Sequence, residues 1–146
     1  MEIRPGRKWI KAASVIMLII GICGIVVSAA GIVGYSQMDA NMAADMETIG
    51  ISVAAQKTQL AVSGAVYLAQ LVAAVIGLAS LNYPERDRLC LGAGIVILAC
   101  HLGNLIYGVL GSGFSLIALA GFVLAAVFPA IYCLGAFKNL KAGAED

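Results

Sequence analysis

Three strongly polar side chains interrupt the apolar stretches of this sequence, and they are the residues best able to do chemistry. Gln70, His101 and Asn104 each lie in a run that carries no charged residue. His101 and Asn104 are three positions apart, so they would share one face of a helix. Strongly polar groups are costly to keep in a membrane, which makes them candidates for a functional role. Tyr67 and Tyr107 could add hydroxyl groups to the same cluster.

Two interpretations of this cluster stay open. Gln70, His101 and Asn104 could line a ligand pocket, or they could form interhelical hydrogen bonds that hold two helices in register. Such bonds contribute about 0.6 kcal/mol on average and about 1.7 kcal/mol at most. His101 is the only histidine of the chain, and a haem or metal site would need a second ligand from elsewhere. We therefore expect no metal and no cofactor.

Methionines and cysteines offer weaker chemistry. Met38, Met42 and Met46 recur every four residues, which predicts one face of an amphipathic helix. Packing is the simpler interpretation of this stripe, and binding of Cu(I) by the thioethers is the alternative. The cysteines form no Cys-x-x-Cys pair, so we interpret them as small buried hydrophobes. They are Cys23, Cys90, Cys100 and Cys133.

The elements that must position these residues are membrane-spanning helices. Hydrophobic residues make up 62% of the 146 residues and charged residues only 12%, against about 45–50% and about 25% in soluble domains. The charged residues fall in four short stretches, and a span needs roughly 20 apolar residues. We predict a single all-α transmembrane domain, an antiparallel four-helix bundle with left-handed packing. Its spans are about 12–35, 59–81, 88–110 and 116–137, with an amphipathic outer loop at 36–58.

The basic residues predict the orientation of the chain. Eight of the nine lysines and arginines fall on one side of a four-span topology, and only Lys57 falls on the other. Basic residues in short loops stay in the cytoplasm, so we expect both termini there. The basic start, the apolar run and Ser28-Ala29-Ala30 also resemble a cleaved secretory signal. However, this apolar run is longer than a typical signal core, and we expect it to be retained as the first span.

Small residues recur at 3–4 spacing along each span, which is typical of a packed helix seam. In the first span this stripe could serve the bundle itself or a second subunit. The packing residues that we single out are Gly21, Gly24, Ser28, Gly31, Gly77, Gly94 and Gly108.

Two prolines mark special places. Asn82 and Pro84 predict a helix start, with Asn82 as its cap. Pro129 lies inside the fourth span and predicts a kink, which is either structural or a gating hinge.

Several function classes are disfavoured by what the spans lack. Apart from Arg88 at the boundary of the third span, they contain no Asp, Glu, Lys or Arg, whereas ion-coupled carriers usually need a membrane-embedded carboxylate. There is no phosphate loop, nucleophile elbow or HExxH motif, so we expect no enzyme. With a net charge of +1 and no extended basic run, nucleic acid is not an expected partner. We interpret the N-terminal basic residues and Trp9 as a membrane anchor.

The segments NYPER (82–86) and PAIYCLGAFKN (129–139), together with the four-span layout, resemble small, functionally uncharacterised four-helix membrane proteins of Gram-positive gut bacteria. The resemblance implies a bacterial plasma membrane. Our first hypothesis is a structural or accessory subunit that associates with itself or with a membrane-protein partner in the lipid bilayer. The alternative is a binder or conduit for a small neutral or apolar molecule, and an unrecognised membrane enzyme comes third.

Overall fold

The described residues form four long helices and two short helical segments. The computed structural model describes residues 4–113 and 115–143. The long helices are α1 (Arg7–Ser36), α3 (Val53–Ala79), α4 (Asp87–Ser112) and α5 (Leu116–Ala142). The short segments are α2 (Ala40–Thr48) and the 3₁₀ turn η1 (Pro84–Arg86). All four long helices are long enough and apolar enough to cross a membrane, which confirms the predicted number of spans.

Each long helix is longer than the span predicted for it, with 26 to 30 residues, although α3 ends at Ala79, two residues before the predicted end. At 1.5 Å per residue, 27 residues reach about 40 Å, which exceeds the roughly 30 Å of a hydrocarbon core. The extra turns carry charged residues such as Lys11 and Lys138. The backbone therefore stays helical after its side chains have become hydrophilic, and hydropathy alone does not detect these turns.

Polar side chains and glycines set the helix ends. Asp39 and Ser52 accept hydrogen bonds from backbone amides at the starts of α2 and α3, as helix caps do. Ser115 does the same for α5. Gly113 has a φ of +82°, a conformation that favours glycine, and it ends α4. This residue lies between the spans predicted at 88–110 and 116–137.

The predicted cap at Asn82 is wrong. Pro84 does occupy the first position of η1, but the residue before it is Tyr83, which makes no side-chain capping bond. Asn82 instead accepts a hydrogen bond from Arg7 through its Oδ1, at 2.7 Å. The amide therefore joins the N-terminus to the turn between α3 and α4.

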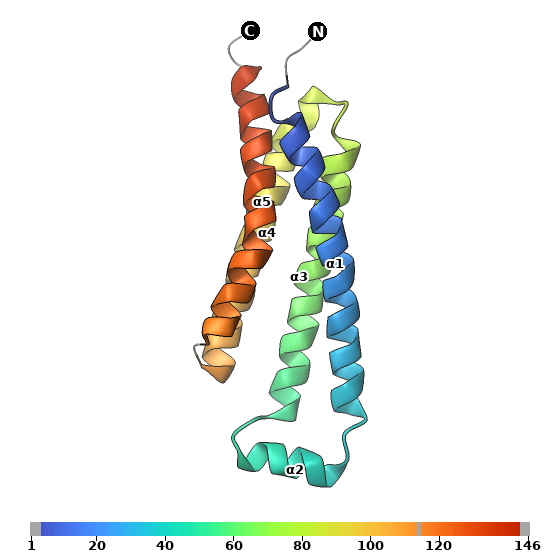
Figure 1. Cartoon of the computed structure of the whole chain (residues 1–146), viewed down its shortest axis with the longest axis vertical. Coiled ribbons are helices and arrows are strands. Elements are labelled where there is room, and N and C mark those ends of the chain that lie inside the picture. Colours follow the sequence, from blue (N-terminus) through green and yellow to red (C-terminus); the bar gives the residue numbers. More distant parts are fainter. Residues whose placement is uncertain (1–3, 114, 144–146) are drawn as a thin grey trace.

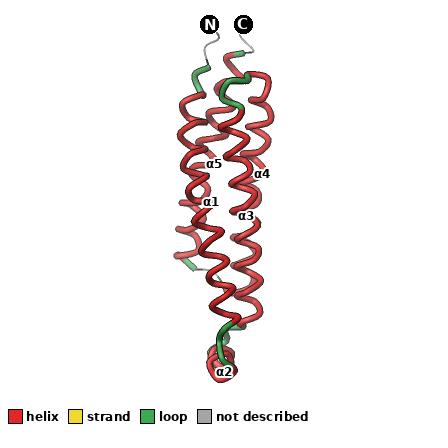
Figure 2. The backbone as a smooth tube through the Cα atoms, turned by 90° about the vertical axis from the view of Figure 1, so that its right-hand side faces the viewer, coloured by secondary structure: helices red, strands yellow, loops and turns green. Residues whose placement is uncertain are grey.

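The long helices pack antiparallel in the cyclic order α1, α3, α4, α5 (Figures 1 and 2). The most extensive contacts lie within two pairs, α1 with α3 and α4 with α5. Figure 1 shows these pairs close together near the termini and diverging toward α2. We call the two ends of the bundle the termini end and the α2 end.

Most of the buried core lies in the half of the bundle nearest the termini. Tyr132 is fully buried in α5, and its hydroxyl donates to the carbonyl oxygen of Ala73 in α3 at 3.2 Å. The other core residues come from the start of α1, the end of α3, the start of α4 and the end of α5. They are Ile10, Ala13, Met17, Ala73, Ala74, Cys90, Ile97 and Ala136.

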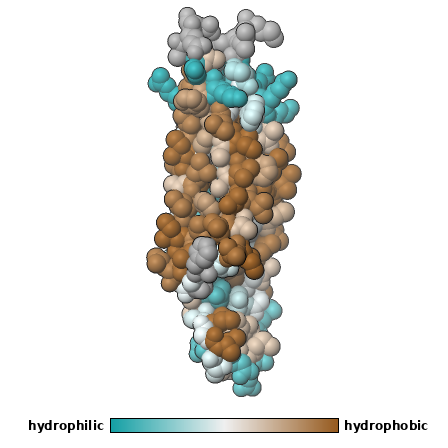
Figure 3. Space-filling view, turned by 60° about the vertical axis from the view of Figure 1, so that its left-hand side comes forward, coloured by the Kyte–Doolittle hydropathy of each residue, from teal (hydrophilic) through white to brown (hydrophobic). Residues whose placement is uncertain are grey.

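The outer surface matches a membrane environment. A broad hydrophobic band separates hydrophilic groups at the two ends in the view of Figure 3. α2 lies across the α2 end, contacts α3 only lightly and has no buried residue. The amphipathic prediction for the loop thus yields a helix over 40–48, and Met42 in it is 54% exposed. Met38 precedes this helix.

Candidate functional site

Gln70 and His101 meet in the middle of the bundle. The Oε1 atom of Gln70 on α3 lies 2.6 Å from the Nε2 atom of His101 on α4. The Nε2 atom of Gln70 donates to the carbonyl oxygen of Met17 on α1 at 3.0 Å. Gln70 is fully buried and His101 is 4% exposed. One side chain therefore joins three helices, in a region where an unpaired amide would be costly.

Asn104 belongs to a separate polar group, one turn closer to the α2 end. Its Oδ1 accepts from Nε2 of Gln59 at 3.0 Å, and its Nδ2 donates to Oγ of Ser63 at 3.2 Å. The three polar residues singled out in the sequence are thus divided between two neighbouring hydrogen-bonded groups. Gln59 was not singled out, although positions 59, 63 and 70 share one helical face and carry that signal.

A cavity of about 180 Å³ lies beside both groups, between α3, α4 and α5. An apolar cavity of about 150 Å³ is enough to bind benzene, so this space suits a molecule of similar size. Polar side chains come from α3 and α4, whereas α5 contributes small and aromatic apolar residues. The lining residues are Gln59, Tyr67, His101, Asn104, Leu105, Gly108, Ala118, Gly121, Phe122 and Ala125.

The two candidate tyrosines have different places. Tyr67 lines the cavity, and its ring meets the His101 ring edge-to-face, with the centroids 6.0 Å apart. Tyr107 is 43% exposed and lines a separate depression of about 60 Å³ beside Gln56 and Gln59. The structure therefore brings Tyr67, and not Tyr107, next to His101.

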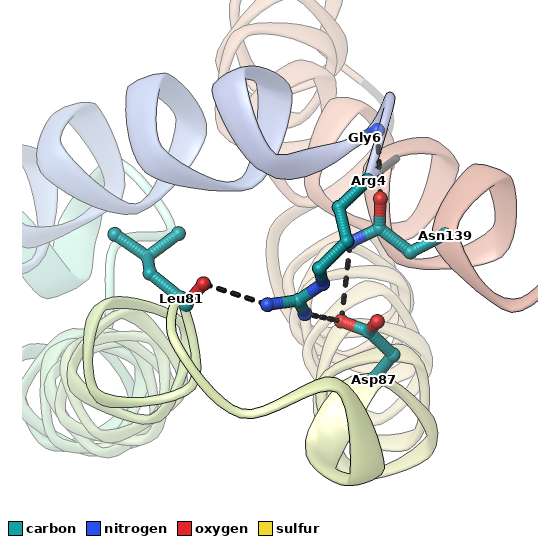
Figure 4. Close-up of polar contacts among 5 residues, drawn as sticks. All are labelled: Arg4, Gly6, Leu81, Asp87 and Asn139. Atoms are coloured by element: carbon teal, nitrogen blue, oxygen red, sulfur yellow. Dashed lines mark hydrogen bonds and ion pairs between the residues drawn. The ribbon is translucent and has the colours of Figure 1, made fainter. Parts of the chain in front are cut away.

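The termini end is closed by a polar network that we call the clasp, made of Arg4, Gly6, Leu81, Asp87 and Asn139 (Figure 4). Arg4 pairs with Asp87 at 2.5 Å and also donates to the carbonyl oxygen of Leu81 at 2.6 Å. Asn139 donates to Asp87 at 3.2 Å and accepts from the Gly6 amide at 2.7 Å. The N-terminal segment, α3, α4 and α5 all meet here.

The clasp corrects the membrane-anchor interpretation for Arg4 alone among the N-terminal basic residues. The Arg4 and Asp87 side chains are only 11% and 5% exposed, so Arg4 is an internal ion-pair partner. Lys138 lies over the Trp9 ring, 4.3 Å from its centroid, and that pair fits the interfacial position expected for Trp9. No sequence pattern predicts the clasp, because charges in tails and short loops are usually solvated.

The predicted packing residues of α1 lie against α3. Gly21 and Gly24 leave room for the backbone and the ring of Tyr67, and Gly31 leaves room for Leu60. Ser28, which is buried, faces Gly64. The stripe on α1 thus serves the bundle itself. Gly77 and Gly94 face Tyr132, and Gly108 lies beside the Gln59 amide.

The remaining candidates are dispersed. All four cysteines are free, and only Cys90 is buried. Cys23 is exposed on the surface of α1, which corrects its interpretation as a buried hydrophobe. α5 continues as one helix through the buried Pro129, and the kink there stays a prediction. In residues 4–113 and 115–143, no three His, Cys, Asp or Glu side chains are grouped to hold a metal ion.

No protein-family model, curated protein or solved structure matches this chain. The structure itself shows a four-helix chain with four candidate membrane spans.

Proposed function

We propose that this protein binds a small neutral molecule within the membrane, in the cavity between α3, α4 and α5. The observation that carries the proposal is the cavity of about 180 Å³ that lies against His101 and Asn104. The site is built like many ligand pockets, which combine mainly apolar walls with a few polar groups that fix orientation. No charged side chain lines the cavity, so a neutral ligand matches it best.

The unequal packing of the two halves supports the same proposal. The termini half holds the buried core and the clasp, whereas the cavity lies in the half toward α2. A ligand would therefore reach the cavity from the water at the α2 end, and the clasp would prevent passage to the termini end. This arrangement favours a binding protein over an open channel.

We infer that the α2 end faces the outside of a bacterial plasma membrane and that both termini are cytoplasmic. The distribution of lysine and arginine supports this orientation. A C-terminal green fluorescent protein fusion should fluoresce, and alkaline phosphatase inserted at Gly50, between α2 and α3, should be active. The reverse pair of results would overturn the orientation.

Cysteine labelling tests whether the cavity is accessible. In a chain whose four native cysteines are replaced by alanine, Ala125→Cys places a thiol on the cavity wall, and Leu124→Cys places one on the exposed face beside it. Thiols react as thiolates, which form where water has access. In liposomes, a charged, membrane-impermeant maleimide should label Ala125→Cys and leave Leu124→Cys unlabelled. Equal, slow labelling of both would overturn the proposal.

The second candidate function is that of a structural or accessory subunit. The observation that favours it is the start of α5, where Leu116 and Ile117 are 75% and 85% exposed. A second copy or a partner helix packed there would cover them. An intermolecular disulfide at Ile117→Cys and a dimeric mass in lipid nanodiscs would favour this candidate over a monomeric binding protein. Neither candidate includes a reaction, a cofactor or a nucleic-acid partner.

A further inference from the structure

The hydrogen-bond chain that begins at Met17 fixes the orientation of the Gln70 amide. A backbone carbonyl oxygen can only accept, so the atom of Gln70 that faces Met17 must be the Nε2 donor. The Oε1 atom of Gln70 then faces His101. The two ends of this amide cannot be exchanged without placing two acceptors against each other at Met17.

The same reasoning fixes the tautomer of His101. The Oε1 atom of Gln70 can only accept, and it lies 2.6 Å from Nε2 of His101, so Nε2 carries the proton. In a neutral imidazole the other ring nitrogen is then an acceptor. The edge-to-face contact with Tyr67 packs against the ring in this orientation. Nδ1 of His101 is therefore a lone-pair acceptor.

This acceptor is available to a ligand. Within the described parts of the chain, Nδ1 of His101 has no hydrogen-bond partner, and this atom is not completely buried. His101 as a whole is only 4% exposed, and the space that it lines is the cavity. A nearly buried imidazole thus offers one unused acceptor to that space.

We infer that the cavity selects a neutral hydrogen-bond donor, a compact molecule that gives an N–H or O–H group to Nδ1 of His101. This inference rests on the proposed function and names its ligand class. The apolar walls at Leu105, Phe122 and Ala125 fit the hydrocarbon part of such a molecule. A buried polar group left without its partner disfavours ligands that lack the matching group.

The single histidine makes this inference directly measurable. In protein labelled with ¹⁵N-histidine, only His101 contributes imidazole signals. The spectrum in lipid nanodiscs should show a protonated Nε2 and an unprotonated Nδ1. Pyrrole and furan then serve as probes, because they are rings of nearly equal size and only pyrrole has an N–H donor. Pyrrole should shift the Nδ1 signal and should bind about fivefold more tightly than furan, the difference made by one neutral hydrogen bond.

Two variants serve as controls. Gln70→Leu removes the acceptor that holds the proton on Nε2, so both tautomers should be present and the preference for pyrrole should fall. Ala125→Trp fills the cavity and should abolish the shifts caused by either probe. A proton on Nδ1 of the neutral His101 ring in the unmodified protein, or equal binding of pyrrole and furan, would overturn the inference. Failure of maleimide to reach Ala125→Cys would instead overturn the proposed function.

Discussion

At the scale of single residues, the bundle depends on polar groups whose partners lie on other helices. Gln70 uses both ends of its amide, one toward α1 and one toward α4. A helix in lipid satisfies its own backbone but not its polar side chains. Gln70 therefore favours one rotation and one depth of α3 relative to its neighbours, and apolar surfaces alone specify these much less.

A double-mutant cycle measures the bond between Gln70 and His101. We expect Gln70→Leu and His101→Leu each to lower the free energy of unfolding in detergent micelles, with a coupling of about 1 kcal/mol between them. Pairing Gln70→Leu with Leu110→Ala, at an exposed and distant position, should give additive effects. A coupling below about 0.3 kcal/mol for the first pair would show that the hydrogen bond contributes little.

The burial of Gln70 and His101 could be predicted from the sequence, but the burial of the clasp residues could not, for a physical reason. Gln70 and His101 interrupt apolar runs, so their burial followed from the length of the spans. Asp87 and Asn139 lie where charged and polar residues are ordinarily solvated, and only tertiary packing buries them. The hydrophobic signal that locates a span gives no information about which charges beyond its ends become paired.

At the scale of elements, the face between α1 and α3 is the most extensive helix contact. Gly24 lies against the ring of Tyr67, and Gly31 lies against the flexible end of Leu60, whereas Gly34 has no neighbour near its Cα. Small residues let the backbones approach, and this approach provides much of the attraction between helices in lipid. The 3–4 spacing marks this face of α1 in the sequence but does not indicate whether it packs against α3 or another subunit.

Alanine substitutions on α1 should therefore rank in a fixed order. Gly24→Ala should lower the unfolding free energy by about 1–3 kcal/mol, because a rigid aromatic ring must move. Gly31→Ala should cost less, since the Leu60 side chain can adjust. Gly34→Ala should be neutral or stabilising by up to about 1 kcal/mol through helix propensity. Circular dichroism during thermal unfolding gives the order, and a Gly34 variant as damaging as the Gly24 variant would contradict it.

At the scale of the whole molecule, the helices pack more closely at the termini end of the bundle than at the α2 end. The termini end combines the buried core with the clasp, and the backbones of Gly6 and Gly135 are in contact there. Toward α2 the two helix pairs diverge, and polar groups and the cavity lie between them. The number of long apolar helices could be predicted from hydropathy, but this divergence could not, because it depends on side-chain volumes at facing positions.

The clasp should dominate the stability of the termini end. Asp87→Ala leaves Arg4 buried without its partner and should lower the unfolding free energy by about 3 kcal/mol. Glu85→Ala, which removes an exposed charge two positions away, should change it by less than about 0.5 kcal/mol. The double variant Arg4→Met with Asp87→Leu should recover part of the loss, because apolar replacement of a buried pair is often neutral. Equal effects of Asp87→Ala and Glu85→Ala would contradict this account.

The clasp also has a consequence for the order of synthesis. Arg4 leaves the ribosome first, Asp87 follows after two spans, and Asn139 is added only when the last helix is nearly complete. Until then, the amide of Gly6 and one bond to Asp87 lack their partner. A chain that stops before α5 therefore lacks the partner of these two groups, whereas a chain that includes α5 supplies it through Asn139. Chains with and without α5 therefore differ in unpaired polar groups, and a membrane protease could distinguish them by this difference.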